Sequence, residues 1–146
     1  MTGPAAASCL LTLNGKPYVQ LPHNLCIGYT DALIGQPSSP EYGTVICDRP
    51  ENTYLFLQKL VGYTHERQAI WKIVAIQSIG QLSDDLIALS AGCTYKSGKT
   101  APLVALVQDH SANYTTHAAW EVNLVQQSFD PIDPSTVICQ DPFSFP

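Results

Sequence analysis

Four segments in the second half of the chain carry the apolar and β-branched residues typical of strands, and short polar turns separate them. The segments cover residues 70–79, 86–95, 102–108 and 118–126. The last alternates most regularly, with Trp120 and Val122 on one face and Glu121 between them on the other. Connections of this length join antiparallel neighbours, so the pattern predicts a four-stranded antiparallel meander.

The segment before these strands has the spacing of an amphipathic helix. Leu55, Phe56 and Leu60 recur at helical intervals, Asn52 or Thr53 would cap the start, and Gly62 would end the helix. We therefore predict a helix over 53–63 and an α+β fold, in which this one helix packs on a curved, mainly antiparallel sheet. The order of elements resembles that of cystatin-like and cone-shaped NTF2-like folds, a resemblance that carries no information about activity.

The two ends of the chain are expected to flank this arrangement. Asn14-Gly15 is a strong hairpin signal between the short apolar runs 9–13 and 17–21, and 43–47 could add another short strand. Four prolines follow Asp130 and predict an extended tail. With 146 residues, we expect a single domain, 1–146, made of a turn-rich segment 1–50, the helix and meander 51–128, and a proline-rich tail 129–146.

The composition bears on partners and compartment. Charged residues make up 13% of the chain, about half the usual share, which favours a surface that works in an assembly. The net charge of −5, with seven scattered Lys and Arg residues, argues against nucleic acid as a ligand. No apolar run is long enough for membrane insertion, and no signal peptide is visible. We predict a cytoplasmic protein; a secreted or periplasmic location stays open if a signal peptide has been removed.

Five cysteines at wide spacings form no Cys-x-x-Cys pair, so neither a zinc ribbon nor a redox dithiol is indicated. In a reducing cytosol they would be small buried apolar residues. In an oxidising compartment up to two disulfides could form and leave one thiol. The sequence does not select a connectivity; Cys26 with Cys47 and Cys93 with Cys139 is one choice among several.

No catalytic motif is complete, so we predict no catalytic residue and no cofactor. Ser97-Gly98-Lys99-Thr100 lacks the earlier glycine of a phosphate loop, because Cys93 occupies that position. Asp109, His110 and His117 flank a predicted turn and offer a ligand set for zinc or iron. Their spacing matches no known metal motif, and they remain the only candidates for a metal site.

Three hypotheses about function follow from these observations. The first is a non-catalytic binding or accessory domain whose partner is a protein and which serves as a subunit of a larger assembly. The second is a small enzyme or ligand carrier with a pocket between the helix 53–63 and the sheet. The third is a secreted, disulfide-stapled module of the kind that includes inhibitors.

Overall fold

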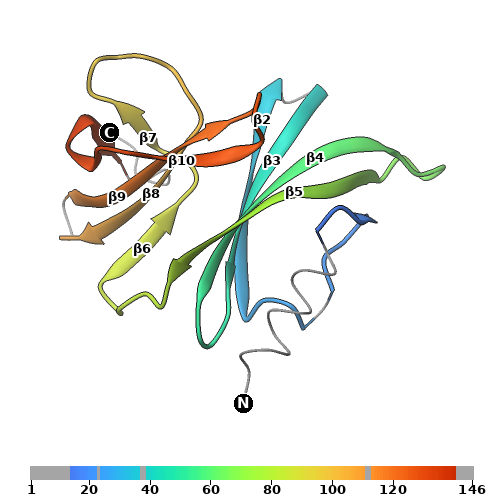
Figure 1. The fold of residues 1–146 in the computed structure, drawn as a ribbon, viewed down its shortest axis with the longest axis horizontal. Coiled ribbons are helices and arrows are strands. Elements are labelled where there is room, and N and C mark those ends of the chain that lie inside the picture. The colour runs from blue at the N-terminus through green and yellow to red at the C-terminus, as the bar shows by residue number, and fades with distance from the viewer. Residues whose placement is uncertain (1–13, 23, 37–38, 111–112, 141–146) are drawn as a thin grey trace. The chain divides into compact units, whose positions relative to one another are not determined.

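The structure, a computed structural model, describes residues 14–22, 24–36, 39–110 and 113–140, and almost all of its regular structure is β (Figure 1). In chain order the strands are β1 (Pro17–Tyr18), β2 (Gly28–Gln36), β3 (Ser39–Asp48), β4 (Thr53–Tyr63), β5 (Ala69–Gly80), β6 (Leu86–Leu89), β7 (Cys93–Tyr95), β8 (Leu103–Asp109), β9 (Tyr114–Asn123), β10 (Ser128–Ile132) and β11 (Val137–Cys139). Within the described ranges the one helical element is η1 (Pro134–Thr136), a single turn of 3-10 helix.

The predicted α+β fold is therefore wrong, because the predicted helix 53–63 is the strand β4. Leu55, Phe56 and Leu57 are consecutive and all fully buried, which happens when both faces of a central strand are covered. A helix would have turned one of the three towards solvent. Helical spacing and a continuous apolar run coincide over this short segment, and periodicity alone does not separate them.

The residues interpreted as a helix start form the turn between β3 and β4. Arg49 and Asn52 exchange backbone hydrogen bonds of 2.9 and 3.3 Å, which closes a tight hairpin. The Thr53 hydroxyl donates to the Asp48 carboxylate across the two strands at 3.1 Å. A residue type that caps helices thus serves here as a cross-strand partner.

The chain divides into two compact units, Met1–Gln81 and Leu82–Pro146. The first unit holds a five-stranded antiparallel sheet in the order β1-β5-β4-β3-β2, the long strands coloured blue to green in Figure 1. Its core cluster comprises Leu25, Val45, Cys47, Phe56 and Ile73. Tyr18, Leu21 and Cys26 pack against this cluster, so the segment leading into β2 covers one face of the sheet.

The second unit holds a four-stranded antiparallel sheet, β10-β9-β8-β6, and a two-stranded pair, β11-β7. Its core cluster comprises Leu103, Ala105, Val107, Ala119, Val137 and Cys139. The predicted four-stranded meander does not form, because β5 belongs to the first unit's sheet. The segment 86–95, predicted as one strand, is broken at Gly92, whose φ of 85° suits glycine, and its halves β6 and β7 join different sheets.

The predicted C-terminal tail also differs from the structure over its described residues. The residues after 128 do not form an extended tail up to residue 140, since β10 pairs with β9 and β11 pairs with β7. At the other end β1 pairs with β5, at Pro17↔Lys72 and Tyr18↔Trp71. The first arm of the predicted N-terminal hairpin, 9–13, and the last residues of the predicted tail lie outside the described residues.

Candidate functional site

The described structure does not bring the three candidate metal ligands together into one group. Asp109 ends β8, His110 follows it in the turn, and His117 lies on β9. The His110 backbone amide donates to the carbonyl of Asn113 at 2.9 Å, so this residue closes the hairpin turn. Nowhere in the described ranges do three His, Cys, Asp or Glu side chains gather into a group that could hold a metal ion.

His117 belongs instead to a chain of surface hydrogen bonds. Its Nε2 lies 3.0 Å from Oε1 of Gln108, whose Nε2 donates to the Asp85 carboxylate at 3.0 Å. The hydrogen bond from the Ser83 hydroxyl is the main reason why the pKa of Asp85 lies below its ordinary value. The glutamine separates the imidazole from the carboxylate, so this chain lacks the direct base-to-carboxylate contact of a catalytic triad.

Each unit contains one disulfide. Cys26, just before β2, is bonded to Cys47 on β3, and Cys93 on β7 is bonded to Cys139 on β11. Both pairs are among the connectivities that the sequence leaves open. Cys9 lies outside the described residues. Since each bond closes within a unit, each unit carries its own covalent constraint.

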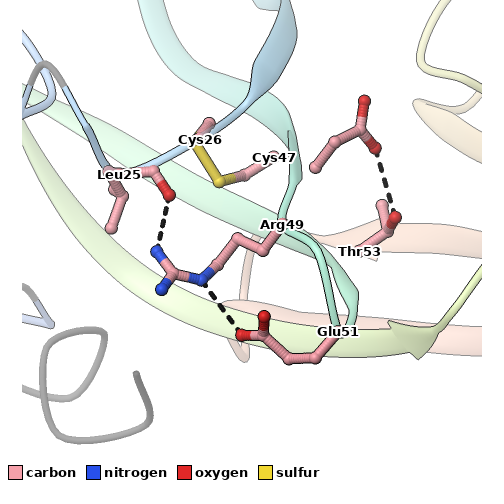
Figure 2. Close-up of a disulfide and its surroundings, with 7 residues drawn as sticks. Leu25, Cys26, Cys47, Arg49, Glu51 and Thr53 are labelled. Carbon is pink, nitrogen blue, oxygen red and sulfur yellow. Dashed lines mark hydrogen bonds and ion pairs between the residues drawn. A yellow bond between two sulfur atoms is a disulfide. The ribbon is translucent and has the colours of Figure 1, made fainter. Parts of the chain in front are cut away.

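Further contacts hold the entry to β2 beside this first disulfide (Figure 2). The Arg49 guanidinium donates to the carbonyl oxygen of Leu25 at 2.5 Å and pairs with the Glu51 carboxylate at 3.3 Å. The Ile27 amide donates to the Asp48 carbonyl at 2.7 Å. Arg49 is 14% exposed, so the ion pair is better shielded from water than an ordinary surface pair. The start of β2 is thus fixed against the β3–β4 hairpin.

Beyond this anchor, β2 is an edge strand with unusual exposure of apolar side chains. Among the strands described it pairs with β3 alone. Tyr29 is 57% exposed and Leu33 is 55% exposed, and Ile27, directly before the strand, is 72% exposed. Asp31, between Tyr29 and Leu33, is also exposed, and no ion pair joins its side chain to another described residue.

The pairing register shows which face these side chains share. Tyr29 lies opposite Cys47, Asp31 opposite Val45 and Leu33 opposite Gly43. Residues that face each other across strands project to the same side of a sheet. The exposed side chains of β2 therefore continue the face that carries the buried core residues Val45 and Cys47.

A small pocket lies at the same edge. Its lining comprises Gln20, Leu21, Pro22, Cys26 and Tyr29. The lining residues come from the segment that covers the sheet and from the exposed face of β2. We define the β2 edge as Ile27, strand β2 and this pocket, and it is the candidate functional site of the first unit.

The two edge strands of the second unit's four-stranded sheet differ from β2. The edge strands β6 and β10 have four and five residues, against nine in β2. Pro131 on β10 has no amide hydrogen, which restricts pairing there. Short edges and edge prolines are common protections against unwanted pairing. The β2 strand has neither.

No protein-family model matches the chain, and neither a curated protein nor a solved structure matches it. No helix among residues 14–22, 24–36, 39–110 and 113–140 has the length and apolar character needed to cross a membrane.

The β2 edge is absent from the features that the sequence pattern predicts. Gly28 and Gly35 belong to the turn-forming residues of the segment 1–50, so the sequence pattern predicts no strand between residues 22 and 42. The signal that could have found it is the alternation of Ile27, Tyr29, Asp31 and Leu33.

Proposed function

We propose that the protein is a non-catalytic protein-binding domain that serves as a subunit of a larger assembly. The observation that carries the proposal is the β2 edge: nine residues at the side of a sheet with exposed tyrosine and leucine side chains and a single charge. Exposed apolar side chains on a long edge strand that contains no proline favour association with another protein. A chain with only 13% charged residues supports the same conclusion.

The hypothesis of a pocket between a helix and a sheet loses its basis, since the helix on which it depended is the strand β4. The polar chain at Asp85, Gln108 and His117 gives no second argument for catalysis, because no nucleophile lies beside the imidazole in that chain of hydrogen bonds.

The compartment we propose is an oxidising one, outside the cytosol. The two disulfides Cys26–Cys47 and Cys93–Cys139 favour it, because reducing conditions in the cytosol keep such bonds open. They also favour a secreted, disulfide-stapled module as the second candidate, in which the partner would be an enzyme that the domain inhibits.

Alkylation of native protein before and after reduction tests whether the two disulfides are present. We expect four cysteines to react only after reduction, and five accessible thiols at the start would contradict the proposed compartment.

Native size measurement tests the assembly directly. Size-exclusion chromatography with light scattering, applied to an extract of the native source, should place the protein in a complex heavier than one chain. The recombinant protein, run alone, is the control that shows whether copies of the chain account for the mass. A protein that elutes from the native extract with the mass of one chain would refute the proposal.

A further inference from the structure

We infer that the β2 edge accepts an extended segment of a partner protein as an added strand, and that this segment has a basic residue flanked two positions away on each side by apolar residues. The inference rests on the proposed binding function and specifies the surface and the chemistry of the partner. It starts from the pairing of β2, which within the described residues uses only the side towards β3.

The backbone provides the first half of the recognition. An edge strand leaves alternate N–H and C=O groups without a strand partner, and an incoming extended chain can pair with them. Adding a strand requires an edge that is already in place. The Cys26–Cys47 disulfide and the hydrogen bond from Arg49 to Leu25 hold the start of β2 in that position (Figure 2). The backbone hydrogen bond from Ile27 to Asp48 adds to them.

The side chains of one face provide the second half. Tyr29, Asp31 and Leu33 alternate as apolar, acidic and apolar on the face continuous with the core. In an added strand, the residues opposite them lie two positions apart on the same face. Apolar residues opposite Tyr29 and Leu33 would extend the buried face of the sheet. A lysine or arginine opposite Asp31 would match its charge.

The pocket marks one end of this surface. It is lined by Leu21, Pro22 and Cys26 beside Tyr29. An apolar side chain of the added strand opposite Tyr29 would lie next to this pocket.

Asp31 also disfavours a second copy of the chain as the occupant. In antiparallel pairing of two β2 strands, the register that sets Tyr29 against Leu33 of the other copy also sets Asp31 against Asp31, because both pairs have the same midpoint in the strand. Like charges directly opposite each other destabilise a pair of strands. A register that is shifted by two residues sets Asp31 of one copy opposite Tyr29 or Leu33 of the other copy instead. The single charge on β2 thus favours a basic partner over self-association.

A charge-exchange experiment tests the inference. Two fluorescent peptides, TVTKTVT and TVTETVT, differ only at the central residue and are titrated by anisotropy against the full chain and against Asp31→Lys. Wild-type protein should bind the lysine peptide about fivefold more tightly than the glutamate peptide, since attraction is exchanged for repulsion at one cross-strand position. The Asp31→Lys variant should reverse this preference.

Three controls separate strand addition from nonspecific hydrophobic binding. Leu33→Thr should weaken binding of the lysine peptide, whereas Val125→Thr should not, because Val125 is 94% exposed and lies in the second unit. Hydrogen exchange should become slower in β2 when the lysine peptide is bound and stay unchanged in the edge strand β6. An N-methylated lysine peptide, which lacks backbone donors, should not bind.

Several results would overturn the inference: no binding of either peptide, equal binding of both, or a preference that Asp31→Lys leaves unchanged. Self-association of wild-type protein through β2, seen as slowed exchange in β2 at high protein concentration, would also overturn it in favour of a second copy. If the native extract contains a heavier complex but the peptide experiments give one of these results, the proposed function stands and only the assignment of β2 as the binding edge is wrong. If no complex exists, the proposed function itself fails.

Discussion

Removing either disulfide should destabilise the unit that contains it, and the two bonds allow a graded prediction. Cys26 and Cys47 are 21 residues apart in sequence, and Cys93 and Cys139 are 46 apart. A cross-link stabilises mainly by limiting the unfolded chain, and the limit grows with the size of the loop. The loop-closure relation gives about 3 kcal/mol for the shorter loop and about 4 kcal/mol for the longer.

The two tryptophans make the measurement specific to each unit. Trp71 lies on β5 in the first unit and Trp120 on β9 in the second. Urea unfolding is followed by fluorescence in a Trp120→Phe background for the first unit and in a Trp71→Phe background for the second. Cys26→Ala with Cys47→Ala should lower the unfolding free energy reported by Trp71, and Cys93→Ala with Cys139→Ala should lower that reported by Trp120.

Reduced protein is the matched control. It lacks the cross-links but keeps every sulfur atom, so it separates the loop effect from the loss of packing around Cys47 and Cys139, both of which are buried. The reduced parent should lie close to the alanine variants. An unfolding free energy within about 0.5 kcal/mol of the oxidised parent, for either double variant, would refute the reasoning because such a change is typical of a surface substitution.

Three further predictions concern substitutions at single positions. Gly43→Ala should cost about 1–3 kcal/mol, because its Cβ would lie 3.0 Å from Nε2 of buried Gln58. Gly62→Ala, with no described atom within 4 Å, should change stability by at most about 0.5 kcal/mol, and equal effects in urea unfolding would contradict this contrast. Tyr18→Phe removes the hydroxyl that donates to Gln58 and should cost about 1–3 kcal/mol by the same assay; an unchanged midpoint would contradict it. Hydrogen bonding to a carboxylate raises the pKa of Tyr95 to about 12, so stability should fall as pH rises from 10 towards 12, and the Tyr95→Phe variant should lose less over that range.

The strand segments with clear β character were predictable from the sequence. Expected strands at 70–79, 102–108 and 118–126 correspond to β5, β8 and most of β9, and 43–47 lies within β3. Alternation and β-branched residues are local properties of the chain, so these segments can be recognised without their partners.

The partners themselves were not predictable, and this is where the expected fold fails. Leu55 to Leu57 are buried on both faces of β4, which lies between β3 and β5, a long-range arrangement that no local pattern contains. Gly92 divides 86–95 between two sheets for a similar reason: a glycine within an alternating run reads as a tolerated interruption until the pairing is known.

The candidate site was likewise predictable only in its local pattern and not in its long-range contacts. The alternation of Tyr29, Asp31 and Leu33 can be read in the sequence, but its meaning depends on β2 being an edge. The neighbouring contact of Arg49 with the Leu25 carbonyl joins residues 24 positions apart and has no sequence signal. Position in the sheet, rather than residue type, turns this strand into a candidate binding surface.

Site-specific photo-cross-linking in the native source tests the central claim most directly. A photoreactive residue placed at Leu33 samples the β2 edge, and the same residue at Val125 samples an exposed site in the second unit. We predict a defined adduct with one protein from position 33, none from position 125, and loss of the adduct when Asp31→Lys is added. Equal labelling from both positions, or an adduct that Asp31→Lys leaves unchanged, would contradict the assignment of β2 as the binding edge.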